Sequence, residues 1–285
     1  MNPSRFIYLN GQYLPESQAL IPVADRGFRF GDGLFETIRI HHGVPYQWEF
    51  HMQRMRDGLT ELRITCNEDW VTITKNLLEK NAQTAGFIRI AISRGVGSRG
   101  YRPHPKNLAP TIVVESLRDM SGPQHAYNVW VSRYTKPSLS ALPVNHKIAQ
   151  GLNSTLALLE AEDNQCEEAI LLTQDGMVCE AASANILWLK DGTLFTPDLK
   201  TGCLHGSTRE ALIRLASITT TIAPIDSLKN AEAVWIMNGR IGIHPIQHIK
   251  PLNSDFAKHP MTEALKRLLL NDSDSYTNTH RKAWQ

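Results

Sequence analysis

Tight-turn dipeptides between short apolar runs constrain the fold of this chain more than any other sequence feature. Such dipeptides occur at Asn10-Gly11, His42-Gly43, Asp175-Gly176 and Asp191-Gly192. Because dipeptides of this kind suit the positive φ angles of a two-residue hairpin, each is predicted to join two antiparallel strands. The last two turns lie close together in the sequence, and the runs around them predict an antiparallel meander over residues 169–195.

Apolar residues at helical spacing alternate with the strand-like runs. Met52, Met55 and Leu59, for example, recur at intervals of three or four residues and predict one face of a helix. These patterns predict helices over residues 51–62, 70–78 and 155–161, and further strands over 87–93, 111–115 and 129–131. We therefore predict a mixed α/β chain of the α+β class, with a small N-terminal α/β domain and a larger strand-rich C-terminal domain.

The length of 285 residues and a hydrophobic content of 42% suit two domains of ordinary size or one large domain. A polar stretch that contains the Gly122-Pro123 breaker separates two strand-like segments, so we predict an interdomain linker there. The tail is polar and unpatterned and is predicted to be frayed. The predicted organisation is an N-terminal domain over 1–118, a linker over 119–126, a C-terminal domain over 127–270 and a flexible tail over 271–285.

Composition excludes several functional classes. The formal net charge of +2 gives no basic field for nucleic-acid binding. No apolar stretch approaches the roughly 20 residues of a membrane span, and the first residues lack a hydrophobic signal core, so we expect a cytoplasmic protein. The four cysteines form no Cys-x-x-Cys pair. His244 and His248 have helical ligand spacing, but Pro245 between them disfavours a helix, so no metal is expected.

Residues 206–216 predict a helix start that can bind an anion. Ser207 and Glu210 have the spacing of a capping box, with Ser207 as the N-cap, and an apolar run follows. Gly206 permits close approach to the backbone, and the first N–H groups of a helix attract negative charge. A lone capping box is more often an ordinary capped surface helix, so the anion-site interpretation depends on the neighbouring motifs.

Five motifs in order resemble those of the fold-type IV pyridoxal phosphate enzymes, which include branched-chain aminotransferases, D-amino acid transaminases and 4-amino-4-deoxychorismate lyases. The resemblance extends from about Ile7 to about Pro251. It implies a two-domain D-amino acid aminotransferase-like fold, pyridoxal 5′-phosphate as cofactor and a small-molecule amine substrate. It also implies a homodimer in which a partner loop completes each site. The motifs are residues 24–37, 51–55, 144–148, 179–186 and 202–210.

The same resemblance assigns roles around the cofactor. Lys147 matches the lysine that forms a Schiff base with the cofactor and then shuttles protons as a free amine. Glu180 matches the carboxylate that pairs with the pyridine nitrogen, and Asn185 matches a supporting residue of the same motif. Many transaminases have a tyrosine shortly after the lysine; here Gln150 and Asn153 are alternative replacements. The phosphate is assigned to Arg54, Gly206, Ser207, Thr208 and the turn at Asn238.

Two further stretches bear on which member of the family this is. Residues 92–101 are similar to a stretch typical of bacterial 4-amino-4-deoxychorismate lyases, and Thr37 matches a threonine implicated in lyase chemistry. Arg94, Arg99 and Arg102 are predicted to cluster on one loop, which suits a substrate with two carboxylates.

The short motif Arg102-Pro103-His104 is instead similar to the Arg-x-His pair that holds a substrate carboxylate in D-amino acid transaminases. Arg99, Arg102 and His104 are therefore the candidate substrate-binding residues. The resemblance ranks the lyase first, a D-amino acid transaminase second and a branched-chain aminotransferase third. A catalytically silent homologue is disfavoured because every core cofactor position is filled. A cofactor-free binding or scaffold protein is the alternative from another class, and it predicts no chromophore after purification.

Overall fold

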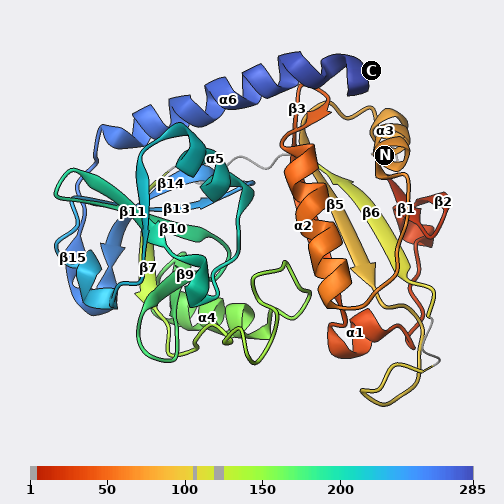
Figure 1. Cartoon of the computed structure of the whole chain (residues 1–285), viewed down its shortest axis with the longest axis horizontal. Coiled ribbons are helices and arrows are strands. Elements are labelled where there is room, and N and C mark those ends of the chain that lie inside the picture. Colours follow the sequence, from red (N-terminus) through yellow and green to blue (C-terminus); the bar gives the residue numbers. More distant parts are fainter. Residues whose placement is uncertain (1–4, 105–107, 119–124, 285) are drawn as a thin grey trace. The chain divides into compact units, whose positions relative to one another are not determined.

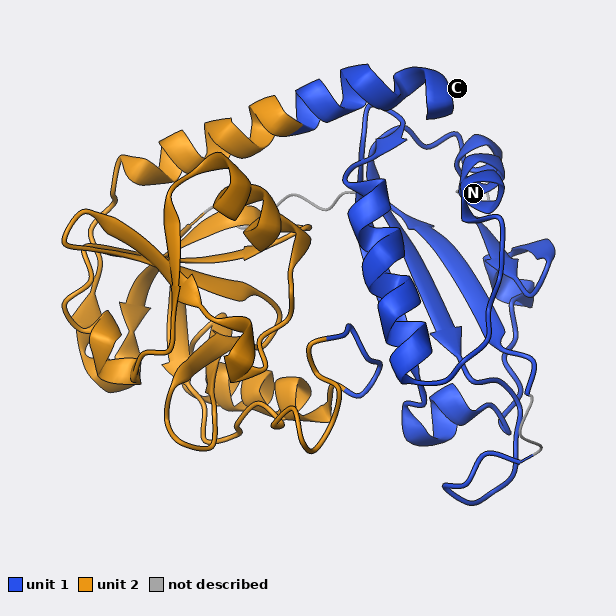
Figure 2. Ribbon diagram, in the orientation of Figure 1, with its two compact units in different colours: residues 1–121, 146–150, 273–285 blue, residues 122–145, 151–272 orange. Residues whose placement is uncertain are grey.

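The computed structural model describes residues 5–104, 108–118 and 125–284, and it divides into two compact units (Figure 2). Unit 1 comprises residues 1–121, 146–150 and 273–285, and unit 2 comprises residues 122–145 and 151–272. The division after Ser121 falls in the predicted linker, of which residues 119–124 lie outside the described ones.

Residues 146–150, predicted as part of the C-terminal domain, belong instead to unit 1. The physical reason is backbone pairing along one edge of a strand of that unit. The N–H of Phe35 donates to the carbonyl of Lys147 at 2.9 Å, and the N–H of Ala149 donates to the carbonyl of Gly33 at 2.9 Å. Lys147 is therefore fixed by the sheet of unit 1.

Unit 1 is built on a six-stranded sheet in the order β2-β1-β6-β5-β3-β4, and every neighbouring pair is antiparallel. Positive φ angles at Asn10 (47°), Gly11 (92°), His42 (49°) and Gly43 (80°) confirm the two predicted N-terminal hairpins. The strands are β1 (Phe6–Leu9), β2 (Gln12–Pro15), β3 (Gly33–His41), β4 (Val44–Pro45), β5 (Gly86–Ser93) and β6 (Thr111–Leu117).

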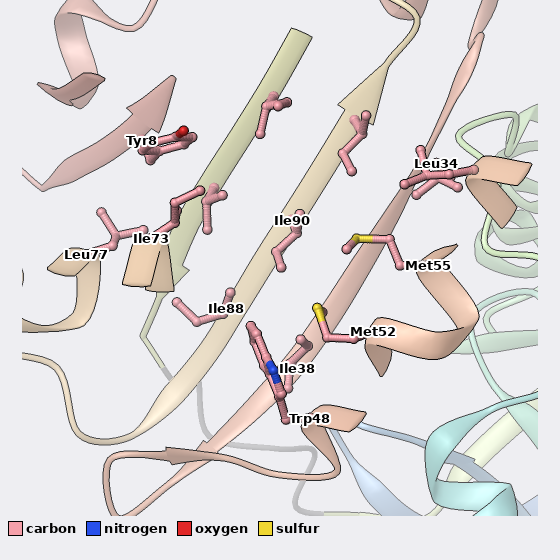
Figure 3. Packing of buried hydrophobic residues seen from close by; sticks show 14 of the residues in the cluster. Tyr8, Leu34, Ile38, Trp48, Met52, Met55, Ile73, Leu77, Ile88 and Ile90 are labelled. Carbon is pink, nitrogen blue, oxygen red and sulfur yellow. The ribbon is translucent and has the colours of Figure 1, made fainter. Parts of the chain in front are cut away.

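Helices cover one face of this sheet, and the core of unit 1 lies between them (Figures 1 and 3). Met52 and Met55 of one helix pack toward Ile38 and Ile90 of the sheet, as Figure 3 shows. Each such buried side chain contributes on the order of 1.5–3 kcal/mol to folding. The helices over this core are α2 (Trp48–Glu61) and α3 (Trp70–Lys80). Helix α1 (Arg26–Phe30) contributes no residue to it, and a 3-10 turn, η1, spans Glu16–Gln18.

Unit 2 contains a nine-stranded mixed sheet in the order β12-β11-β10-β13-β14-β7-β8-β9, with β15 paired to β14. The strands are β7 (Tyr127–Val131), β8 (Glu168–Leu172), β9 (Val178–Ala181), β10 (Asn185–Lys190), β11 (Thr193–Pro197), β12 (Ile218–Thr221), β13 (Ala233–Asn238), β14 (Gly242–Ile249) and β15 (Ser254–Asp255).

The predicted meander over residues 169–195 is only partly correct. The hairpins β8–β9 and β10–β11 form, but β13, β14 and β7 separate β10 from β8 in the sheet order. Strand β7 is also parallel to both β8 and β14. Turn dipeptides determine only the strands that they join, whereas burial of the apolar strand β13, with Trp235 and Ile236 fully buried, decides the rest.

Helices and short turns complete unit 2. The predicted helix over residues 155–161 is confirmed within a longer one. A buried hydrogen bond of 2.8 Å from the Trp235 indole N–H to the Thr262 hydroxyl joins the sheet to the last helix. The elements are α4 (Leu152–Asp163), η2 (Leu199–Thr201), α5 (Ser207–Leu215), η3 (Ile225–Leu228), η4 (Lys250–Leu252) and α6 (Met261–Trp284).

The predicted frayed tail over 271–285 is wrong, because α6 continues to Trp284. Side chains of its last turns have partners in unit 1 that no local sequence pattern reveals. The Tyr276 hydroxyl donates to Glu49 at 2.5 Å and accepts from the Trp48 N–H at 3.0 Å, and the Trp284 ring lies 4.8 Å from that of Trp48. Among the helices of the described residues, none is long and apolar enough to cross a membrane.

Candidate active site

Lys147 lies beside β3 in unit 1, with its amine against an aromatic ring. Its Nζ is 4.7 Å from the centroid of the Phe35 ring. Thr37 projects from the same face of β3 as Phe35, since side chains alternate along a strand. Arg89, opposite Thr37 on β5, places its guanidinium 4.5 Å from the same ring. An amine, a hydroxyl and a cation therefore gather on one face of the sheet.

The opposite face of β3 carries a buried polar network. Glu36 is 1% exposed and accepts from Arg54 Nε at 2.7 Å, from Arg54 Nη2 at 2.5 Å and through a bond with His51 Nδ1 at 2.7 Å. Burial alone would raise the pKa of Glu36, but the charge of Arg54 and the bonds from both partners lower it to about 2. Glu36 is therefore ionised, and it orients the planar guanidinium of Arg54.

Glu36 had no role assigned from the sequence. Two sequence features could have identified it: an acidic residue at an inward position of a strand, and His51 and Arg54 three residues apart on α2. Burial lowers the pKa of His51, and the positive charges of Arg54 and Lys147 lower it further against the opposing effect of Glu36. The histidine is therefore neutral at neutral pH.

Glu180 on β9 of unit 2 is held at both carboxylate oxygens. Its Oε1 accepts a hydrogen bond from Lys136 Nζ, and its Oε2 accepts from the Leu204 N–H at 2.7 Å. Burial lowers the pKa of Lys136, but the neighbouring Glu180 carboxylate more than offsets this and raises it. Lys136 is a residue that sequence reasoning missed, because a single loop lysine carries no distinguishing pattern.

Helix α5 begins differently from the prediction. Gly206, not Ser207, is the N-cap, and no side chain of the described residues caps the helix. The carboxylate of Glu210 bonds the ring of His205 at 2.8 Å instead of closing a capping box. A Cβ on residue 206 would lie 2.0 Å from Oδ1 of Asn185, so a side chain there would displace Asn185. The N–H groups at the start of α5 therefore meet no side-chain acceptor that would compete with an anion for them.

The segment that leads into α5 is fixed on two sides. Leu204 donates its N–H to Glu180, and its carbonyl accepts from Asn185 Nδ2 at 2.8 Å. The guanidinium of Arg209, 3% exposed in the first turn, donates to the Pro197 carbonyl at 2.9 Å, and its Nε has no partner among the described residues. A buried cation thus reinforces the positive end of the helix dipole.

Asn238, at the end of β13, uses its side chain to build the turn that follows. Its Oδ1 accepts from the N–H groups of Arg240 at 2.8 Å and Ile241 at 2.9 Å, and its Nδ2 donates to the Ser183 carbonyl at 3.0 Å. The bonds tie this turn to the loop between β9 and β10, so any cofactor contact made here would come from the turn's backbone.

The candidate substrate residues Arg99, Arg102 and His104 are exposed on the loop after β5. Arg94 follows β5 directly at the start of this loop, and its guanidinium is paired with a carboxylate; the cluster of three arginines stays a prediction. Arg94 donates to Asp32 from Nε at 2.8 Å and from Nη2 at 2.9 Å. Arg26 secures the same loop by donating to the carbonyls of residues 100 and 101 at 2.8 and 2.7 Å.

Comparison with known proteins identifies the family. Residues 33–249 match the model of the family described as amino-transferase class IV. The chain belongs to the class IV aminotransferase family. A similar curated protein is an aminodeoxychorismate lyase from Bacillus subtilis (strain 168), which is 30% identical over 275 residues, with 92% of each chain covered.

Other class IV relatives have different activities in their names. A putative branched-chain-amino-acid aminotransferase from Methanocaldococcus jannaschii is 34% identical over 253 residues, covering 85% of this chain and 87% of the relative. A D-alanine aminotransferase from Bacillus licheniformis is 25% identical over 281 residues, covering 95% and 98%.

Solved structures share the class IV fold. The branched-chain amino acid aminotransferase from Escherichia coli superimposes with a TM-score of 0.87 at 24% identity, and 94% of each chain is covered. A putative 4-amino-4-deoxychorismate lyase from Legionella pneumophila does so with a TM-score of 0.82 at 23% identity, covering 90% and 97%. These comparisons confirm the predicted two-domain α+β fold, the family and pyridoxal 5′-phosphate as cofactor.

The residues of this class IV chain fit that cofactor. Lys147 supplies a primary amine. Helix α5 has a glycine as its N-cap, and no described side chain caps the N–H groups of its first turn. Of the two alternatives for the missing tyrosine, Gln150 donates to the Phe30 carbonyl at 3.1 Å. Nδ2 of Asn153 is instead buried without a partner among the described residues. Of the two residues, Asn153 is therefore the one whose amide N–H donor has no partner among the described residues.

Proposed function

We propose that this protein is a 4-amino-4-deoxychorismate lyase that forms 4-aminobenzoate and pyruvate, a step of folate biosynthesis. The observation that carries the proposal is the placement of the Thr37 hydroxyl on the face of β3 where Phe35 supports the Lys147 amine. The similarity to aminodeoxychorismate lyases over nine-tenths of the chain supports the same choice.

Bound pyridoxal 5′-phosphate would supply an electron sink for negative charge that develops next to the substrate amine. Lys147 would hold the cofactor and, once released, take the proton from the carbon that bears the amine. Glu180, held by Lys136 and the Leu204 N–H, would keep the pyridine nitrogen protonated. The start of α5, with Ser207 and Thr208, and the oriented Arg54 would hold the phosphate.

Breaking the carbon–oxygen bond requires a second proton movement. As the enol-ether oxygen leaves, the methylene carbon of the departing group must gain a proton to become pyruvate. The Thr37 hydroxyl, or the Lys147 amine, would deliver it. Arg89 presents a cation on the same face of the sheet, and Arg99 is exposed on the neighbouring loop, so these two residues would bind the two substrate carboxylates.

A D-amino acid aminotransferase is the second candidate. It is supported by the D-alanine aminotransferase relatives at 25–27% identity and by the Arg102-Pro103-His104 motif. In that case Lys147 would return the proton to the cofactor and not expel a leaving group. A branched-chain aminotransferase ranks third, supported by the Methanocaldococcus jannaschii relative.

The deciding experiment supplies purified protein with 4-amino-4-deoxychorismate and follows both products. Equimolar 4-aminobenzoate and pyruvate, formed without a keto-acid acceptor, are expected. If cofactor-loaded protein forms neither but converts D-alanine and 2-oxoglutarate, the function is transamination. Protein that retains no lysine-bound cofactor would instead support the binding or scaffold alternative.

Replacing Arg102 and His104 together by alanine separates the two leading candidates. Both side chains are exposed, so the fold should be unaffected. Lyase turnover is expected to stay within a few-fold of wild type if the likeness to the transaminase pair is accidental. Steady-state assays of both reactions check this, with the exposed Lys200→Ala as control. Selective loss of D-alanine transamination would reverse the ranking.

Lys136→Met tests the support of Glu180. The change leaves a buried carboxylate without its cation, so the free energy of unfolding of cofactor-free protein should fall by about 3 kcal/mol. In cofactor-loaded protein Glu180 keeps a cationic partner, so the loss should be smaller. Urea unfolding of both forms measures the difference, with the exposed Lys200→Met as control. Equal losses in both forms would argue against the proposed role of Glu180.

We also propose that the protein is a homodimer. Val23 and Phe28 of unit 1 are each 77% exposed, and together with Ile21 they line an apolar depression of about 360 Å³. Apolar side chains gathered in this way favour a covering partner. Light scattering is expected to give twice the mass of one chain, and a monomer at working concentration would contradict the proposal.

A further inference from the structure

A second cluster of reactive side chains lies in unit 1, at the far end of β3 from Lys147. We propose that His41, His42 and Asp274 bind a divalent transition-metal cation of the zinc class. His41 is six residues beyond Phe35, which corresponds to about 20 Å along a strand. The proposed site is therefore separate from the residues assigned to catalysis, and it does not depend on the proposed function.

The three residues have ligand geometry. One ligand atom from each lies within 4.8 Å of the other two, and no other such group of histidine, cysteine and carboxylate side chains occurs among the described residues. Zinc ligands stand about 2.0–2.2 Å from the ion, so their atoms are separated by about 3.3–3.6 Å. Moving from the present spacing to that one requires shifts of about 1 Å, which side-chain rotation supplies.

The local backbone explains why two adjacent histidines point the same way. Successive residues of a strand project to opposite faces, which would normally separate His41 from His42. His42, however, has a φ of 49° as the first residue of the tight turn to β4, and this breaks the alternation. The centroids of the two imidazole rings are 4.4 Å apart.

Asp274 reaches the pair from α6, which other contacts hold in place. The Thr277 hydroxyl, one turn along the helix, donates to the His41 carbonyl at 3.4 Å, and Tyr276 bonds both Trp48 and Glu49. Asp274 Oδ1 lies 2.6 Å from His41 Nε2. The carboxylate is therefore presented by a fixed helix, so little conformational entropy is lost when a cation binds.

The donor set matches the zinc class. Neutral imidazoles and a carboxylate suit Zn²⁺, Ni²⁺, Co²⁺ and Cu²⁺, whereas Mg²⁺ and Ca²⁺ prefer oxygen ligands alone. Three protein ligands leave one position for water. His42 is exposed and lines an open depression with Thr84, Arg281 and Trp284, so water can reach that position. The bound cation would tie the β3–β4 turn to the C-terminal helix.

A plain histidine–aspartate hydrogen bond is the competing explanation, and the chain contains a matched case. His248 Nδ1 bonds Asp255 in unit 2, and this exposed pair is in no ligand group found among the described residues. If a single exposed histidine–aspartate pair were sufficient to hold the cation, both the His41–Asp274 pair and the His248–Asp255 pair would bind it. If the second imidazole is required, only the site with His42 binds.

Calorimetric titration of untagged, EDTA-treated protein with ZnCl₂ tests the proposal. We expect one Zn²⁺ per chain at this site and a rise of a few degrees in the midpoint of thermal unfolding. His42→Asn, which suits the positive φ, and Asp274→Asn should each raise the dissociation constant at least tenfold and remove the thermal shift. His248→Gln should change neither. Zinc binding that is absent, or equal in wild type and His42→Asn, would overturn the proposal.

Discussion

Lys147→Ala is expected to lower turnover by at least about four orders of magnitude, because under the proposed function it removes both the covalent attachment of the cofactor and the group that moves the substrate proton. The side chain is half-buried, and the segment is held by the backbone bonds between Phe35 and Lys147 and between Gly33 and Ala149. Truncation should therefore leave the fold intact.

The measurement combines product formation with intact mass after borohydride reduction. Wild type should gain the mass of one cofactor per chain, and Lys147→Ala should not. Lys200→Ala, which changes an exposed lysine of unit 2, is the control and should behave as wild type. Cofactor that is still fixed to the chain by borohydride in Lys147→Ala would refute the assignment of this lysine.

Glu36→Gln is expected to lower the free energy of unfolding by about 3–5 kcal/mol at neutral pH. The change leaves the buried guanidinium of Arg54 without its negative partner, and an uncompensated buried charge is costly. Since Glu36 orients Arg54, which we propose to hold the cofactor phosphate, affinity for that phosphate should fall as well. Urea unfolding and cofactor titration measure the two effects. Glu16→Gln, in an exposed pair with Arg5, is the control and should cost under about 1 kcal/mol.

The same variant predicts a pH dependence with a definite sign. The pKa of Glu36 is lowered from 4.5 to about 2 on folding, so its contribution is fully present above pH 4.5 and is lost as the pH falls toward 2. That contribution is on the order of 3 kcal/mol. The stability difference between wild type and Glu36→Gln should therefore narrow over this range. A difference that is constant with pH would show that Glu36 does not act through its charge.

Local patterns predicted the elements that local physics controls. Asn10-Gly11 and His42-Gly43 form the predicted turns because their residues accept positive φ, and the apolar spacing of residues 51–62 produces most of α2. The predicted cap of α5 was displaced by one residue. Asn185, nineteen residues before Leu204 in the chain, takes the space that a side chain at Gly206 would need.

Local sequence patterns could not predict contacts between residues that are far apart in the chain. The sequence of residues 271–284 is polar and unpatterned, but Tyr276 and Trp284 both contact Trp48, which is more than two hundred residues away in the chain. The role of Lys136 is evident only from its bond to Glu180, and the role of Glu36 only from its bond with Arg54 on the adjoining helix. In each case the stabilising contact is with a residue that the sequence does not place nearby.

The sequence by itself determined the family motifs and the turns, and it supplied the proposal of Lys147 as the cofactor lysine, because these depend on residue identity and short-range spacing. Only the tertiary structure decided the order of strands in the unit 2 sheet, the return of residues 146–150 to unit 1 and the pairing of buried charges. These outcomes depend on which apolar faces are buried together and which charges lose their water, and both are properties of the packed chain.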